Sequence, residues 1–140
     1  MAGACCGNRR GGGGSLVLTA TEVTNIPLTY AIDVTSGSVD PNGIVTLTGT
    51  VTCNKRSWVY REGLIRQVRQ DLFLARAYTY HYETCVPDTP TTWSIDVDTE
   101  TSVVFGPGPA VLRTFYEFAT DGWRDDVYTD DVPNDAITLQ

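Results

Sequence analysis

The stretch Gly43–Cys53 alternates apolar side chains with threonines. The apolar positions are Val45, Leu47, Val51 and Cys53, and threonines occupy the even-numbered positions from 46 to 52. Successive side chains of an extended chain point to opposite faces, so this pattern predicts a strand with one face in the core and one in water. The apolar face needs a cover, and in an all-β chain the natural cover is a second sheet.

Similar alternation recurs along the chain between segments rich in turn-forming residues. We expect further strands at residues 28–34, 58–67, 72–82, 93–97, 110–119 and 136–140, turns at 36–38 and 40–43, and loops at 86–91 and 120–133. Composition alone would allow a helix over 61–70, but the neighbouring strands need a partner there. Seven to eight short strands predict an immunoglobulin-like β-sandwich.

The alternation also indicates which side chains share a face. The expected core includes Val45, Leu47, Val51, Trp93, Ile95, Val97 and Leu112. Leu112, Tyr116 and Phe118 are expected on one face of their strand. Tyr78, Tyr80 and Tyr82 also share a face, which we assign to the core; if it faces outward with Trp58, it would be a binding surface.

The 140 residues suit one domain, with a flexible or extended N-terminal arm at 1–27 and the sandwich at 28–140. The first fifteen residues are rich in glycine, which costs the most entropy to order. We expect the arm to contact neighbouring proteins through Cys5, Cys6, Arg9, Arg10, Leu16 and Leu18. Two alternatives remain open, an engineered origin for residues 11–15 and free, exposed thiols at positions 5 and 6.

The net charge of −7 does not favour a nucleic-acid partner, and no apolar run is long enough to span a bilayer. Basic residues concentrate between Lys55 and Arg76, whereas acidic residues concentrate after Glu117. One interpretation is that the basic segment and the acidic segment are two edges of the domain that face solvent. The alternative is that the basic edge of one molecule meets the acidic end of a neighbour.

Cys53 and Cys85 end two expected strands, 32 positions apart. Their spacing is not that of a metal site, so a disulfide is the simplest interpretation, with two buried free thiols as the alternative. Closing this loop would stabilise the fold by about 3.5–4 kcal/mol. Because disulfides persist outside the reducing cytosol, the pair favours an extracellular or virion setting.

Five segments in this order resemble the bacterial immunoglobulin-like sandwich domains of actinobacterial secreted proteins and of virion proteins of their phages. They are Gly43–Cys53, Gly63–Gln67, Cys85, Thr92–Val97 and Phe105–Ala110. The resemblance covers roughly residues 30–140. It departs from antibody domains because Trp93 follows the second cysteine instead of lying between the two. It therefore implies an architecture and not antigen-receptor chemistry.

The sequence does not contain a recognisable catalytic motif such as a nucleophile elbow, a P-loop or a dinucleotide fingerprint. His81 is the single histidine, and we expect a structural role for it. The late aspartates could collect a hard cation, but they lack EF-hand spacing and fit a solvated loop better; they are Asp121, Asp125, Asp126, Asp130 and Asp131. We therefore expect no catalytic residue, metal or cofactor.

These observations predict a non-enzymatic virion structural protein that decorates a phage capsid and is anchored partly by its N-terminal arm. Its partners would be protein neighbours in a symmetric assembly, either capsid proteins or copies of itself, without nucleic acid or membrane. The alternative is a secreted bacterial module that binds a surface ligand. An accessory domain with glycoside hydrolase activity is a third possibility, which the shortage of paired carboxylates disfavours.

Overall fold

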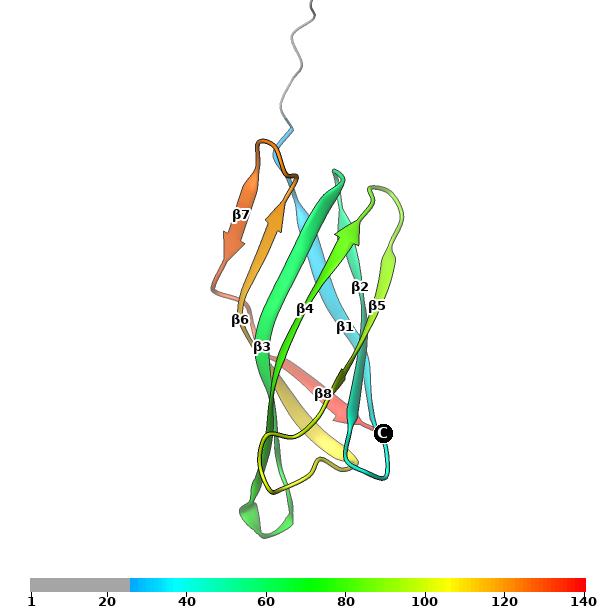
Figure 1. The fold of residues 1–140 in the computed structure, drawn as a ribbon, viewed down its shortest axis with the longest axis vertical. Helices are drawn as coiled ribbons and strands as arrows, with labels where there is room; N and C mark the ends of the chain where they lie inside the picture. Colours follow the sequence, from blue (N-terminus) through cyan, green and yellow to red (C-terminus); the bar gives the residue numbers. More distant parts are fainter. Residues whose placement is uncertain (1–25) are drawn as a thin grey trace, which may run out of the picture.

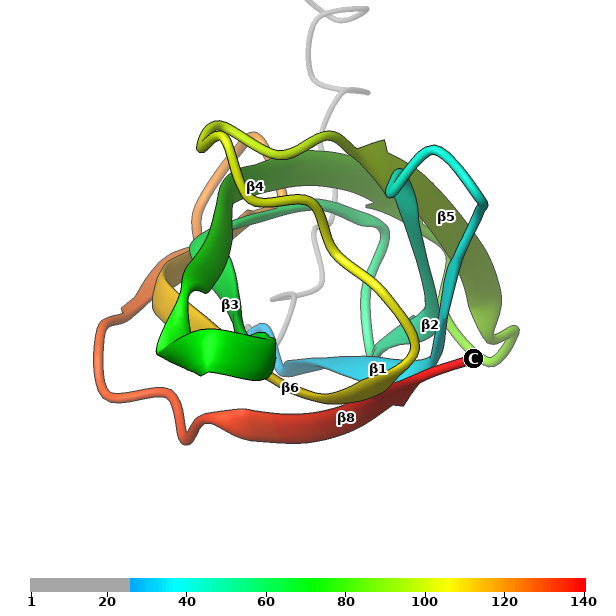
Figure 2. The same cartoon turned by 90° about the horizontal axis from the view of Figure 1, so that it is seen from below.

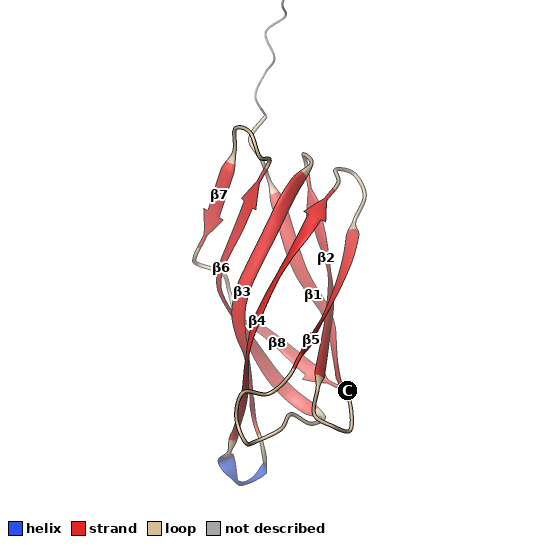
Figure 3. Ribbon diagram, in the orientation of Figure 1, coloured by secondary structure: helices blue, strands red, loops and turns tan. Residues whose placement is uncertain are grey.

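The computed structural model describes residues 26–140, and within them the regular structure is β-sheet apart from one 3-10 turn, η1 (Gln70–Leu72). The strands in chain order are β1 (Tyr30–Val39), β2 (Val45–Cys53), β3 (Ser57–Val68), β4 (Leu74–Cys85), β5 (Thr91–Val97), β6 (Gly108–Thr120), β7 (Asp126–Thr129) and β8 (Asp135–Leu139) (Figures 1 and 3). The prediction of an all-β fold is confirmed. In this part of the chain no helix has the length and apolar character needed to cross a bilayer.

All strands belong to one sheet, in the order β4-β3-β6-β8-β1-β2-β5, with β7 paired to β6. Neighbouring strands are antiparallel except β1 and β8, which meet in parallel at Gly37 and Leu139. Figure 2 shows the strands arranged as an almost closed ring. We expected a second sheet to cover the apolar face of β2, but the cover is the opposite half of the same curled sheet.

Strand β2 follows the predicted alternation, with Val45, Leu47 and Val51 almost completely buried. Its threonines project from the other side, where Thr46 donates a hydrogen bond to Asp96 of β5. At Gly49 the chain passes very close to its neighbours. A Cβ there would lie 1.9 Å from the Asp33 carbonyl oxygen and 2.4 Å from the Trp93 ring. Glycine thus allows the indole to lie directly over β2.

The two halves of the sheet enclose one core. Of the residues expected there, Val45, Leu47, Val51, Trp93, Val97 and Leu112 are buried, and Ile95 is partly buried against them. Cys53 and Cys85 form a disulfide with their Cα atoms 6.2 Å apart. The predicted pairing is confirmed, and it ties the end of β2 to the end of β4 across the core.

Three local expectations are wrong. Residues 36–38 are not a turn but continue β1 as far as Val39, with a register irregularity between Val34 and Ser36. The expected loop 120–133 contains β7, which pairs with the end of β6. The third concerns β6, where the buried side chains are at even-numbered positions in the first part and at odd-numbered positions in the last part. The reason is that the register of β6 against β3 shifts between Glu62 and Gly63.

Candidate docking surface

The outer side of β3 and β4 is aromatic. Inward and outward side chains alternate regularly along both strands, with the odd-numbered positions buried except the half-buried Glu83. On β4 the buried row contains Ala75, Ala77 and Thr79, whereas Tyr80 and Tyr82 are 63% and 70% exposed. Our assignment of the tyrosine row to the core is therefore wrong.

Strand register extends this surface over four neighbouring strands. One row across β4, β3, β6 and β7 consists of Tyr82, Tyr60, Phe118 and Tyr128. The aromatic face, as we name it, comprises Trp58, Tyr60, Tyr78, Tyr80, Tyr82, Phe115, Tyr116, Phe118 and Tyr128. Its rings contact one another, as in the stacked pair Tyr116–Tyr128 with centroids 5.2 Å apart.

A bulge in β6 places its aromatic residues on this face. Tyr116 pairs with Glu62, but the next pair is Thr114 with Gly63, so Phe115 has no partner of its own on β3. The extra residue reverses the parity of the strand, as expected for a bulge. Leu112 therefore points into the core while Tyr116 and Phe118 point outward, and the expectation that they share one face is wrong.

Glu62 lies at the centre of the aromatic face. One of its carboxylate oxygens accepts hydrogen bonds from the hydroxyls of Tyr60, at 2.9 Å, and Tyr116. Burial and the hydrogen bond to Glu62 together raise the pKa of Tyr60 well above its usual value. The same carboxylate is the main cause of the raised pKa of Tyr116. Both phenols therefore stay protonated and hold the two rings in fixed positions.

The aromatic face becomes basic towards the end of the sheet that carries η1. Arg66 of β3 lies opposite Arg76 of β4, and Arg113 follows on β6 with its guanidinium 5.6 Å from the centre of the Phe115 ring. Within residues 26–140 none of the three arginines forms an ion pair with an acidic side chain. A groove of about 660 Å³ continues from this end, with Arg66 and Ile137 among its lining residues.

The opposite side of β3 carries a buried polar cluster. Arg61 donates hydrogen bonds to Thr114, at 2.8 Å, and to Asp135, at 2.7 Å. Its neighbour on β4 is His81, which is buried and packs against Trp93. Burial, reinforced by the Arg61 charge, lowers the pKa of His81 to about 4. The histidine is thus neutral and internal at physiological pH, although within the described structure its Nε2 has no hydrogen-bond partner.

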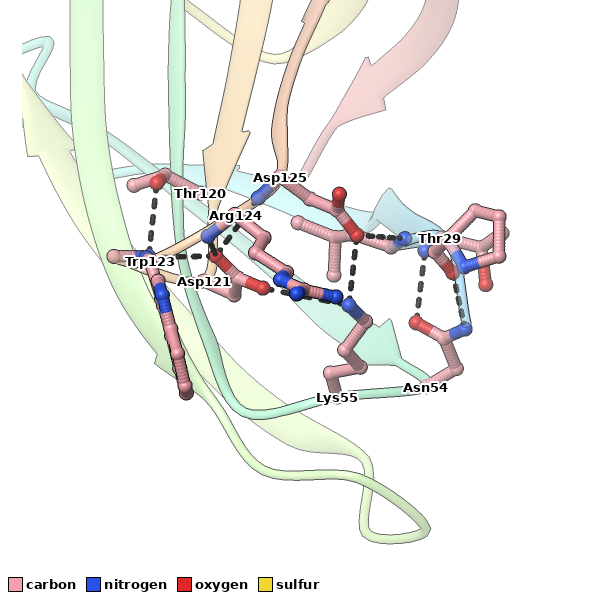
Figure 4. Close-up of polar contacts among 11 residues, drawn as sticks. Thr29, Asn54, Lys55, Thr120, Asp121, Trp123, Arg124 and Asp125 are labelled. Carbon is pink, nitrogen blue, oxygen red and sulfur yellow. Dashed lines mark hydrogen bonds and ion pairs between the residues drawn. The ribbon is translucent and has the colours of Figure 1, made fainter. Parts of the chain in front are cut away.

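The strand β1 begins at a cluster of polar contacts near the start of β3 (Figure 4). Asn54 accepts a hydrogen bond from the backbone N–H of Thr29 and donates one to the carbonyl of Pro27. Asp125 accepts hydrogen bonds from the backbone N–H of Leu28 and from Lys55, at 3.0 and 2.7 Å. These contacts hold Pro27, Leu28 and Thr29 against the segments that precede β3 and β7.

Two of the late aspartates, Asp121 and Asp125, accept hydrogen bonds from groups of the protein itself. Asp121 accepts hydrogen bonds from the backbone N–H groups of Trp123, Arg124 and Asp125, which lower the pKa of its carboxyl. Its other oxygen lies 3.3 Å from the ammonium group of Lys55. Among the residues that the structure covers, no group of three or more potential ligands is placed to hold a metal ion.

The arm residues expected to contact neighbouring proteins, Cys5, Cys6, Arg9, Arg10, Leu16 and Leu18, lie outside the described residues. Within residues 26–140 the strongest candidate site is the aromatic face. The sequence predicted only part of it. Tyr60, Phe115, Tyr116, Phe118 and Tyr128 were not expected there. Alternation along β3 could have predicted that Tyr60 lies on the same face as Trp58. The aromatic residues of β6 reach this face only because of the bulge. Tyr128 lies on β7, a short strand whose alternation of apolar and polar residues is weak.

No protein-family model matches the chain, and no curated protein matches it. The resemblance to immunoglobulin-like domains therefore remains a prediction, and the arguments about function depend on the geometry described above.

Proposed function

We propose that this chain is a non-enzymatic structural protein that docks onto other proteins through the aromatic face, and that it serves as an immunoglobulin-like decoration protein of a phage capsid. The aromatic face carries this proposal. Soluble monomers rarely expose large contiguous apolar patches without a function. Tyrosine, tryptophan and arginine are also the residues that dominate the binding energy of protein interfaces.

The chemistry of the face defines the partner. A strand layer bearing flat rings suits a surface that is itself flat and apolar, because two such layers pack about 10 Å apart. The arginines at positions 66, 76 and 113 would be complemented by acidic groups at one end of the partner's surface. The groove beside them offers space for an apolar side chain of the partner. The partner is therefore a protein surface with an apolar centre and an acidic margin.

The proposed capsid setting is supported by the disulfide and by the contacts at the start of the described domain. The Cys53–Cys85 bond suits a particle that persists outside the cell. Asn54 and Asp125 hold the start of the domain beside the loop that carries Trp123 (Figure 4). Residues 1–27 would bind neighbouring capsid proteins, and symmetry would repeat these contacts enough to offset the entropy lost on ordering.

The immunoglobulin-like assignment is supported by the disulfide across the core and by the buried tryptophan Trp93. Trp93 donates a hydrogen bond from its indole N–H to the carbonyl of Thr50, and its ring lies over Gly49 of β2. Long antiparallel strands on both sides of this core agree with such a domain.

The test uses source particles from which the protein has been stripped, together with full-length chain added back. We expect the unaltered chain to rebind. The double variant Tyr82→Ser, Tyr128→Ser should rebind at least tenfold more weakly, because it removes two exposed rings from one row of the face. The matched control is Phe73→Ser, Val104→Ser, which removes two similarly exposed apolar side chains elsewhere.

Failure of the unaltered chain to rebind would contradict the capsid proposal. Equal binding by the two double variants would show instead that docking does not use the aromatic face. Deleting residues 2–14 tests the arm separately, and unchanged incorporation into particles would exclude an anchoring role for that segment.

A secreted bacterial module that adheres to a surface ligand is the second candidate, and the same exposed tyrosines favour it. Tyrosine presents an apolar ring and a polar tip, which suits recognition of partly polar surfaces. A hydrophobic export signal upstream in the native gene would favour this candidate over the capsid proposal.

A further inference from the structure

One edge of strand β1 is partly unpaired. The other edge carries the ladder to β2. On the free side, and within residues 26–140, β8 pairs with β1 only at Gly37 and Leu139. A hollow of about 400 Å³ lies beside this contact, lined by residues 34–38 of β1 and 136–138 of β8. The first half of β1 therefore has a partner strand on one side and not on the other.

The direction of the backbone groups at this edge follows from the register. The backbone N–H of Asn54 donates to the carbonyl of Thr29, so the odd-numbered residues at the start of β1 direct their backbone groups towards β2. Because this direction alternates along an antiparallel strand, the N–H and C=O groups of Tyr30, Ile32 and Val34 point away from β2. No described residue supplies a hydrogen-bond partner for these groups. Such an edge is a template for a further strand.

The side chains at this edge also lack full cover. Tyr30, Ile32 and Val34 form the inward row of β1 and pack against the core, yet each is only partly buried. The hydroxyl of Tyr30 lies 3.0 Å from the hydroxyl of Thr129 on β7. A side chain thus bridges β1 and β7, which are not joined by a ladder. A further strand beside β1 would bury more of the inward row, which is favourable.

We propose that residues 16–20 of the same chain pair with this edge as an antiparallel strand, with Leu18 opposite Ile32. Leu16, Leu18 and Ala20 then lie opposite the inward row of β1, and these three side chains are all apolar. A shift by one residue would turn Thr19 inward instead, because it moves every side chain to the other face. The backbone hydrogen bonds and the apolar contacts offset the entropy lost on ordering the segment.

The start of the described chain lies where such a strand would connect. Strand β1 begins at the end of the sheet where β6 turns into β7 (Figure 1), and there Asp125 binds the backbone N–H of Leu28. Residues 21–29 would reverse the chain direction, and they include Asn25 and Pro27, which favour turns. This short connection gives the segment a high effective concentration at the edge. The occupant is therefore the chain's own segment and not that of a second copy.

The inference is independent of docking through the aromatic face. It leaves residues 1–15 available to contact neighbouring proteins. A chain that rebinds to stripped particles without the added strand would contradict the pairing and leave the capsid proposal standing. A chain that forms the strand but does not rebind would do the reverse.

The test is disulfide cross-linking in the full chain, in a background with Cys5→Ser and Cys6→Ser. The pair Thr19→Cys, Ala31→Cys places two thiols opposite each other on the outer side of the proposed ladder, where Ala31 is exposed. The control pair is Val23→Cys, Ala31→Cys. An unpaired segment would close this shorter loop at least as readily. We expect the first pair to form an intramolecular disulfide at least tenfold faster than the control pair.

Hydrogen exchange gives a second readout that needs no added cysteine. Leu18→Pro removes an N–H from the proposed ladder and should raise the exchange rate of the Ile32 amide at least tenfold. Gly13→Pro is the control outside the strand and should leave that rate unchanged. The circular-dichroism spectrum of each variant verifies that it is folded.

Three results would overturn the proposal. The first is equal oxidation of the two cysteine pairs, and the second is equal exchange at Ile32 in the two proline variants. The third is a cross-linked product with the mass of two chains, because it would show that a second copy supplies the strand.

Discussion

The guanidinium of Arg61 and the carboxylate of Glu117 face each other in the interior, with Nε and Oε1 3.6 Å apart. The two residues are directly paired between β3 and β6, and both are more than 90% buried. Asp135 of β8 is also an acceptor for Arg61. One buried cation thus connects three strands that lie side by side in the sheet.

Removing that cation should destabilise the fold strongly. Arg61→Met leaves the buried Glu117 without its charge partner, and we expect the free energy of unfolding to fall by about 3–5 kcal/mol. The double variant Arg61→Met, Glu117→Gln removes both charges and should recover much of the loss. Urea denaturation of the single and double variants measures the difference. Equal stability of the two variants would contradict a role for the unpaired carboxylate.

The stability of the protein should fall between pH 6.5 and pH 4 because of His81. Burial lowers the pKa of His81 to about 4 in the folded state, below its ordinary value of 6.5. The unfolded chain therefore binds a proton in this window while the folded chain does not, and protonation favours unfolding. The stability that depends on neutral His81 is fully present above pH 6.5 and is lost as the pH falls to 4. Allowing for residual solvent screening, we expect this loss to lower the free energy of unfolding by about 2 kcal/mol.

The measurement compares urea denaturation at pH 7.5 and 4.5 for the unaltered chain and for His81→Gln. Carboxyl groups also titrate in this range, so the difference between the two proteins isolates the histidine. An identical pH dependence in both would show that His81 does not contribute.

Replacing the central carboxylate of the aromatic face should release the two phenols bound to it. In Glu62→Gln the charged acceptor for Tyr60 and Tyr116 is lost, so the pKa of both phenols should fall towards the ordinary value of about 10. Absorbance of tyrosinate against pH measures this shift. The control is Glu83→Gln on β4, which should leave the titration curve unchanged. If Glu62→Gln leaves it unchanged too, the hydrogen bonds do not set these pKa values.

Loss of the disulfide should lower the free energy of unfolding by about 3.5–4 kcal/mol. The change is Cys53→Ala with Cys85→Ala, and the physical reason is the larger conformational freedom of the unfolded chain once its 32-residue link is open. Chemical denaturation measures the loss. Cys5→Ser with Cys6→Ser is the control, and we expect it to keep the stability of the unaltered chain. A loss below 1 kcal/mol would contradict the expected contribution.

Much of the fold can be predicted from the local pattern of the sequence. The alternation at Val45, Leu47 and Val51 defines an inner row because threonines on the other parity can face water, and the positions of Cys53 and Cys85 at strand ends predict their pairing. These inferences hold because a strand has a fixed period of two, and because a disulfide needs only two cysteines brought close together.

Which face of a strand is buried cannot be predicted in the same way. Alternation shows which side chains lie together but not which group is inside. On β4 the inner row is small, Ala75 and Ala77, and Trp93 fills the core beside His81, so the three tyrosines face outward. The unpaired Phe115 reverses the parity of β6, and local periodicity does not reveal such a bulge. The sequence by itself determined the inner row of β2, the disulfide and every strand except β7. Only the tertiary structure decided the aromatic face, because that surface depends on which neighbouring strands compete for the same interior space.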